Sequence, residues 1–265
     1  MFPCPRAPAL NSLLLLKLLL VPSLIAGITA AGRRWGPAVA GWLSAFPVVS
    51  APILWLLALE RGAGFAAQAA AATLSAVLAI LVFGVAYCRA ARRHGWPLSL
   101  LFSLVAYALA VALLNLWTPP LWLAAAGVLL ALWLAPGAYP APPPYTAPAR
   151  AARGDLFWRM LAAAALVLGV TGGAETLGAR LSGLLAMFPV MASVLAVFSH
   201  HQAGAGFSIR LLRAMVYGYY AFAGFCLVLA LALPAMSLGL AFTLALGVAV
   251  VIQALARSRM QRAAL

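Results

Sequence analysis

The sequence is poor in charge and especially poor in acids. Charged residues make up 8% of its 265 positions, and the only acids are Glu60, Asp155 and Glu175. A soluble domain has roughly 25% charged residues. Hydrophobic residues reach 66%, so too few polar side chains remain to cover a surface that faces water. This composition excludes an ordinary soluble domain and favours membrane crossings, each of which needs about 20 mostly apolar residues.

The scarcity of acids and cysteines also removes most catalytic chemistry. The three cysteines (Cys4, Cys88 and Cys226) are odd in number and lack the spacing of metal ligands. No Asp, Glu or His lies deep in an apolar run, where a proton relay would need one. Nucleotide-binding and nucleophile-elbow motifs are missing as well. We therefore expect no enzyme activity, no catalytic residues, no metal site and no cofactor.

What charge there is has one sign. Lys and Arg number 17, which gives a formal net charge of +14. These basic residues stand in twos and threes between apolar runs, where they act as topology signals and contact anionic lipid head groups. We expect membrane lipids as partners and no nucleic acid. The sequence also allows a small-molecule solute and a second copy of the chain, in a homo-oligomer, as further partners.

Long apolar runs dominate the chain. A lipid-embedded backbone must satisfy its own hydrogen bonds, and these runs lack the alternation of a membrane β-barrel. The sequence therefore predicts an all-α fold, a polytopic membrane helical bundle of about nine transmembrane helices. The predicted helices lie at 13–31, 37–59, 65–88, 97–117, 121–135, 156–172, 179–199, 207–232 and 236–256.

The two halves of the chain repeat each other at a constant offset of 142 residues. Gly36–Val48 aligns with Gly178–Val190, and both segments end in Phe-Pro-Val. The same offset brings Gly-Ala-Gly-Phe at 62–65 onto Gly-Ala-Gly-Phe at 204–207. Shared apolarity does not produce such matches in register. We predict two copies of a four-helix unit, at 1–117 and 156–265, separated at 118–155 by a connector helix and a linker that starts at Pro136 and is rich in proline.

The basic residues predict how the two units are oriented. With nine crossings, thirteen basic residues fall on one side and four on the other. If residues 121–135 did not cross, the division would be eleven to six. Positively charged residues gather on the cytoplasmic side, so we expect nine crossings, two inverted repeats, a periplasmic N-terminus and a cytoplasmic C-terminus. Whether the short run at 121–135 spans the bilayer fully is left open.

Prolines at equivalent positions predict an interruption near the centre of two helices. Pro47 and Pro189 each remove a backbone donor, which would leave the carbonyls of Leu43 and Leu185 without helical partners at membrane depth. Secondary transporters built from inverted repeats use interrupted helices to bind substrate. A packed kink without a ligand is the alternative. The candidate substrate-binding residues are Leu43, Ser44, Phe46, Pro47, Leu185, Phe188, Pro189 and Ser193.

A few polar residues lie within or beside the apolar runs. Lys17 and Arg159 occupy equivalent positions, and Arg210 and Arg213 begin a predicted helix. These four are candidates for a charged gate that attracts anions, whereas snorkelling to the interface is the simpler explanation. Gln253, near the end of the last run, is expected to form a hydrogen bond across helices.

The motif Ala40-Gly-x-Leu-x-x-Phe-Pro47, followed by Glu60-Arg61-Gly62, resembles the GlpM/YdgC-like family of small bacterial inner-membrane proteins. Members of that family are about one four-helix unit long, so the resemblance implies a tandem fusion of two units in the inner membrane. The second half is similar from Leu156-Phe-Trp-Arg159 onward, but Gln202 and Ala203 replace the Glu-Arg pair.

Two functions compete on this basis. The leading hypothesis is a small permease or channel-like transporter of a small neutral or anionic solute. The alternative is a membrane scaffold, or an assembly factor for envelope or secretion machinery, that transports nothing.

Overall fold

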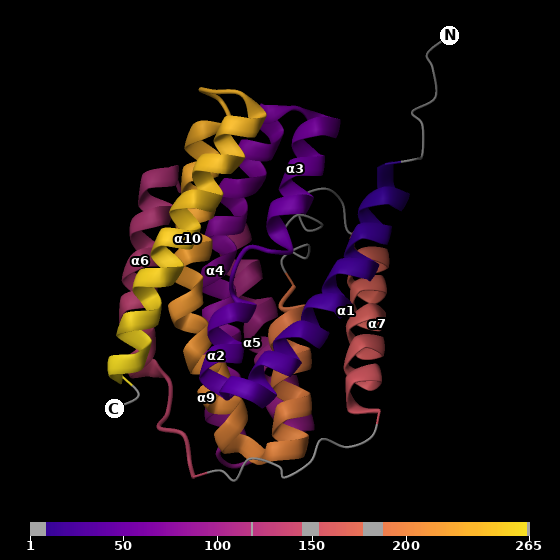
Figure 1. Ribbon diagram of the computed structural model, residues 1–265, viewed down its shortest axis with the longest axis vertical. Helices are drawn as coiled ribbons and strands as arrows, with labels where there is room; N and C mark the ends of the chain where they lie inside the picture. Colours follow the sequence, from indigo (N-terminus) through magenta and orange to yellow (C-terminus); the bar gives the residue numbers. More distant parts are fainter. Residues whose placement is uncertain (1–8, 118, 145–153, 177–187, 264–265) are drawn as a thin grey trace.

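The computed structural model of the protein describes residues 9–117, 119–144, 154–176 and 188–263, and every regular element in these ranges is an α-helix. The prediction of an all-α fold is confirmed for this part of the chain. The helices form an elongated bundle (Figure 1). They are α1 (Ala9–Trp35), α2 (Pro37–Ser44), α3 (Ser50–Arg61), α4 (Ala63–Ala91), α5 (Trp96–Leu116), α6 (Leu121–Ala138), α7 (Asp155–Thr176), α9 (Val190–Ala232) and α10 (Leu238–Ala263).

Five helices within the described ranges are long and apolar enough to cross a membrane: α4, α5, α6, α9 and the part of α10 at Leu238–Ala256. Many large apolar side chains on the outside of the bundle are exposed, among them Leu113, Trp122 and Leu240. A bundle that is apolar on its outer surface as well as in its core suits lipid and not water. The protein is therefore a helical membrane protein.

The connector helix is longer than the sequence predicted. α6 has 18 residues and continues past Pro136 to Ala138, so the prediction that the non-helical linker starts at Pro136 is wrong. The fixed φ of proline is itself helical, and the Tyr139 N–H still bonds to the Ala135 carbonyl at 3.2 Å. At 1.5 Å per residue α6 is about 27 Å long, close to the thickness of the hydrocarbon core.

The long helix α9 lies at the centre of the fold and packs against α2, α4 and α10. It consists of two arms, 190–203 and 205–232, joined at Gly204, whose φ of 77° lies outside the helical region. Gly62 makes the corresponding turn between α3 and α4 with a φ of 88°. Both positions need glycine, because other residues rarely adopt this conformation.

Several helices of the first half run in the opposite direction to helices of the second half in Figure 1. α1 descends from the N-terminus, whereas α7 ascends beside it. α4 descends from the top of the bundle, whereas the second arm of α9 ascends. α5 ascends and α10 descends to the C-terminus. Along α6 the chain returns from the top to the bottom before α7 begins.

Small residues bring α2 and α9 into close contact. A Cβ atom added at Gly218 would lie 2.5 Å from the Trp42 carbonyl oxygen and 2.6 Å from the Ala45 Cβ. A Cβ atom at Gly41 would clash with the carbonyl of Leu211. Lipid removes the hydrophobic drive between helices, so close packing of this kind supplies much of the stability of the bundle.

We expect Gly218→Ala to destabilise the protein by about 1–3 kcal/mol, because the added methyl meets backbone and an alanine that cannot rotate away. Gly127→Ala in α6 is the matched control, since its added Cβ would meet nothing within 4 Å. The measurement is the unfolding midpoint of each purified variant in detergent. Equal midpoints would contradict the close packing of α2 on α9.

Candidate functional site

The helix predicted over 37–59 is interrupted between Ser44 and Ser50, where α2 ends and α3 begins. The Phe46 N–H bonds to the Leu43 carbonyl at 3.2 Å, and the Val48 N–H turns back to the Phe46 carbonyl at 2.7 Å. A bond that spans two residues across Pro47 is that of an inverse γ-turn. α3 then starts with the bond from the Ala51 N–H to the Pro47 carbonyl, 2.9 Å long.

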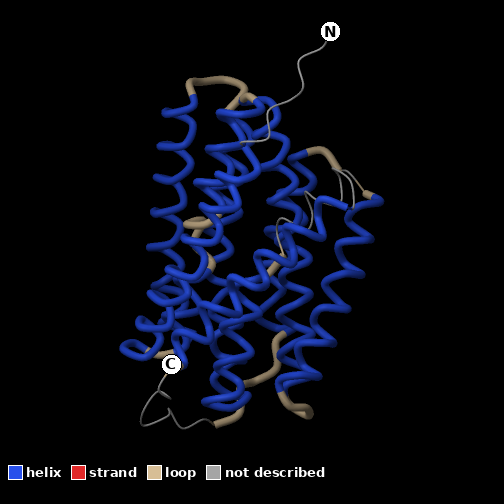
Figure 2. Tube along the Cα trace, turned by 90° about the vertical axis from the view of Figure 1, so that its right-hand side faces the viewer, coloured by secondary structure: helices blue, strands red, loops and turns tan. Residues whose placement is uncertain are grey.

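The backbone bonds of the Phe46-Pro47-Val48 turn recur in the second half, at Phe188-Pro189-Val190 where α9 begins. The Val190 N–H bonds to the Phe188 carbonyl at 2.7 Å, and the Ser193 N–H to the Pro189 carbonyl at 2.8 Å. Pro189 has a φ of −75° and a ψ of 56°, the values of an inverse γ-turn. Each of these bonds repeats a bond of the first half at the offset of 142 residues. The break between α2 and α3 and the start of α9 both lie near the middle of the height of the bundle in Figure 1. Figure 2 shows short loops at that level.

The carbonyl of Leu43 has a backbone partner, which the sequence did not predict. Leu43 was expected to have a free carbonyl, but its oxygen accepts the bond from the Phe46 N–H. The neighbouring carbonyl of Trp42 accepts a hydrogen bond from another helix: the side chain of Gln253 in α10 donates from Nε2 to the Trp42 oxygen at 2.8 Å. The expected cross-helix bond of Gln253 is thus confirmed. The other carbonyl that was expected to be free, that of Leu185, lies outside the described residues.

The predicted substrate-binding side chains differ in their hydrogen bonds, burial and ring contacts. The Ser44 hydroxyl donates to the Gly41 carbonyl of its own helix at 2.8 Å. Leu43, Phe46 and Phe188 are half-buried, and both prolines are buried. The Phe188 ring contacts Tyr107 of α5 edge to face, with centroids 5.7 Å apart.

Two buried polar atoms near the interruptions lack hydrogen-bond partners among the described residues. One is the hydroxyl oxygen of Ser193, a residue that is only 3% exposed. The other is Oε1 of Gln253, whose Nε2 already serves the Trp42 carbonyl. A buried polar atom without a partner is costly, so these two atoms offer bonding capacity to a small polar ligand or to water.

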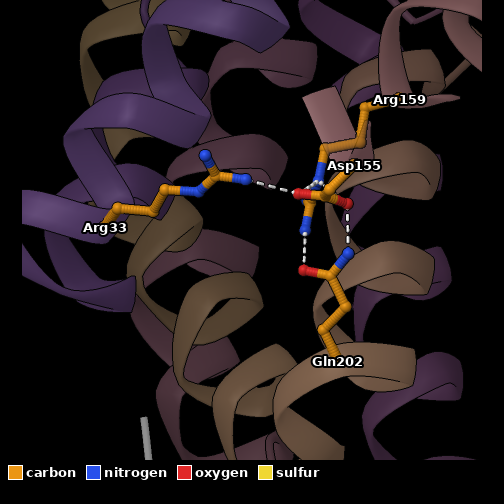
Figure 3. A network of polar contacts seen from close by, with 4 residues as sticks. All are labelled: Arg33, Asp155, Arg159 and Gln202. Carbon is orange, nitrogen blue, oxygen red and sulfur yellow. Dashed lines mark hydrogen bonds and ion pairs between the residues drawn. The ribbon is translucent and has the colours of Figure 1, made fainter. Parts of the chain in front are cut away.

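A second polar site lies where α1, α7 and the first arm of α9 meet (Figure 3). The Asp155 carboxylate, whose side chain is 0% exposed, accepts from Nη2 of Arg33 at 2.6 Å and from Nε of Arg159 at 2.9 Å. Gln202 donates from Nε2 to the same carboxylate and accepts from Nη2 of Arg159 at 3.0 Å. The Arg159 guanidinium also lies over the Phe198 ring, 5.2 Å from its centroid. We call these four residues, Arg33, Asp155, Arg159 and Gln202, the Asp155 cluster.

Of the four candidates for a charged gate, Arg159 alone belongs to this cluster. Arg213 donates from Nη1 to the Pro140 carbonyl at 3.5 Å, which links α9 to the chain that follows α6. Arg210 is exposed at the start of the second arm of α9. The side chain of Lys17 lies outside the described residues.

Sequence reasoning missed Arg33, Asp155 and Gln202 as a group. Arg33 was interpreted as a topology signal, Asp155 as the end of a linker, and Gln202 as a departure from the Glu-Arg pair. One signal was present in the sequence, because Asp155 and Arg159 have the i, i+4 spacing of a helical ion pair. The contacts with Arg33 and Gln202, 122 and 47 residues away from Asp155, carry no comparable signal.

Comparison of the chain with family models, with curated proteins and with solved structures finds no match.

We expect Gln253→Leu to lower the stability of the protein by about 0.5–1.5 kcal/mol, because it removes the hydrogen bond from α10 to the Trp42 carbonyl. The measurement is again the unfolding midpoint in detergent. Thr243→Val in the same helix is the control, since its exposed hydroxyl bonds only to the Gly239 carbonyl one turn earlier. Similar midpoints for the two variants would contradict the proposed role of Gln253.

Proposed function

We propose that the protein is a small permease or channel-like transporter of a small neutral or anionic solute, built from two inverted four-helix units in the bacterial inner membrane. The observation that carries this proposal is the pair of turns at Phe46-Pro47-Val48 and Phe188-Pro189-Val190, which share the same backbone bonds and the first of which separates two helices. Interrupted helices at mid-membrane are the binding elements of many inverted-repeat transporters.

Several observations support inverted repeats. The equivalent helices α1 and α7 run in opposite directions, as do α4 and the second arm of α9. Backbone bonds of nearly equal length recur at both interruptions, and Gly62 and Gly204 share a positive φ. The length of α6 is consistent with a crossing that would invert the second unit. The resemblance to the GlpM/YdgC-like family supports the inner-membrane location and the tandem origin.

Polar groups near the two turns could bind a small solute. Irregular backbone within a membrane is tolerated where it is buried in protein or lines a cavity. Here the buried Ser193 hydroxyl and the Gln253 amide oxygen supply bonding capacity beside such backbone. No carboxylate lies in either interruption, so a neutral or anionic solute suits this environment better than a cation.

Two observations favour the alternative of a scaffold that transports nothing. The Ser44 hydroxyl is turned to its own helix. The rings of Phe46 and Phe188 pack against the hydrophobic core, as they would at a closed kink.

Flux measurements in proteoliposomes distinguish the two functions. We expect uptake of a probe from the set urea, glycerol, acetate and succinate, and a loss of about tenfold when Pro47→Ala and Pro189→Ala are combined. Such a loss corresponds to about 1.4 kcal/mol on the barrier. Alanine restores the missing N–H, and the helix can then close across each interruption.

The matched control is Pro136→Ala, which changes a proline of α6 outside both interruptions and is expected to leave flux unchanged. Absence of uptake for every probe would leave the scaffold as the better explanation. Equal losses for the control and the double variant would separate transport from the interruptions.

The inverted arrangement makes a separate prediction about topology. We expect a reporter at the N-terminus to be active on the periplasmic side and a reporter at the C-terminus on the cytoplasmic side, because an odd number of crossings separates the two ends. Reporter fusions of the full chain measure this directly. Two ends on the same side would refute the proposed nine crossings.

A further inference from the structure

The Asp155 cluster contains more positive than negative charge. Its members Arg33 and Arg159 carry two positive charges, and Asp155 carries one negative charge. Arg159 is only 5% exposed, so its charge is largely withdrawn from solvent. A buried charge is tolerated where an opposite charge and hydrogen bonds compensate it. One carboxylate serves both guanidinium groups here, and one positive charge is left over.

The Asp155 carboxylate is surrounded by side-chain donors in the way that a bound carboxylate ligand would be. Its oxygens accept from three side chains that belong to three helices, α1, α7 and α9. Arginine donates to carboxylates in a planar geometry that lysine does not provide. Gln202 holds the guanidinium of Arg159 from the other side, at 3.0 Å, and so fixes its orientation (Figure 3).

We infer that Arg33, Arg159 and Gln202 form a binding site for a small carboxylate anion, and that the Asp155 side chain fills this site when the anion is absent. An entering carboxylate would take over the contacts now made by Asp155. The two guanidinium charges of Arg33 and Arg159 would then balance two negative charges, that of the bound anion and that of the displaced Asp155.

The cluster is most exposed at Arg33. The side chain of Arg33 is 44% exposed, although its Nη2 contacts an Asp155 oxygen that is fully buried. Arg33 therefore offers an arriving anion a first contact outside the buried part of the cluster. Arg159 and Gln202 then provide the inner contacts, beside the ring of Phe198.

This inference deepens the proposed function and rests on it in one respect, because it names small carboxylates as the class of solute. The binding site itself can be tested without any measurement of transport. A failure of binding and a failure of flux can therefore be told apart.

The test is rescue of a truncated variant by an added carboxylate. Asp155→Ala removes the internal ligand and leaves room for formate, so its unfolding midpoint in detergent is expected to fall. Sodium formate should recover at least half of the fall, whereas sodium chloride at the same ionic strength should recover much less. A ligand that binds only the folded state raises its stability in proportion to the logarithm of its concentration.

Three controls define the site. Wild-type protein should also be stabilised by formate, but less than Asp155→Ala, because the anion must first displace Asp155. Asp155→Asn should respond weakly, because its side chain fills the same space. The double variant Asp155→Ala, Arg159→Gln should show no rescue. Equal effects of formate and chloride on Asp155→Ala, or equal rescue of the double variant, would overturn the inference.

If Asp155→Ala is too unstable to purify in chloride, parallel purifications in formate and in chloride provide the same comparison. Recovery of folded protein in formate alone supports the site, and equal loss in both salts overturns it. Rescue without flux of any carboxylate would keep the binding site and refute small carboxylates as the transported solute. Flux without rescue would keep transport and refute this site.

Discussion

The constraint on which the rest of the structure depends is that a backbone in lipid must satisfy its own hydrogen bonds. It explains why every regular element in the described part of the chain is a helix. It also governs the interruptions, because a proline at mid-membrane removes a donor that water cannot replace. Two kinds of hydrogen bond meet this constraint near Pro47: an inverse γ-turn joins nearby backbone groups, and Gln253 of α10 donates to the Trp42 carbonyl.

Close packing of α2 on α9 follows from the same interruption. α2 has only 8 residues, too few to cross a bilayer or to be stable alone. It is held because Gly41 and Gly218 let its backbone approach α9, and because α10 supplies Gln253. A short helix is thus held in place by two longer helices.

The sequence predicted the membrane class, the all-α fold and most helix boundaries, because these depend on local composition and on apolar length. The offset of 142 residues also led to both Phe-Pro positions, where the backbone bonds are now seen. The prediction for the Leu43 carbonyl was wrong. The presence of Pro47 does not decide which carbonyl accepts the Phe46 N–H, because this depends on how the turn closes. The prediction at Pro136 was wrong for a similar reason: a proline near a helix end can be accommodated when the next donor, here the Tyr139 N–H, still finds its partner.

The Asp155 cluster could not be predicted, because its partners come from segments that approach only in the folded bundle. Its position has a physical logic. α1 and α7 contact each other along one side of the bundle, and the carboxylate joins both of them to α9 through Arg33 and Gln202. Removal of one partner of a buried ion pair is costly because the other charge is left buried, whereas exposed pairs contribute little. The same carboxylate leaves the cluster with one uncompensated positive charge. A contact that joins three helices therefore also creates an environment suited to an anion.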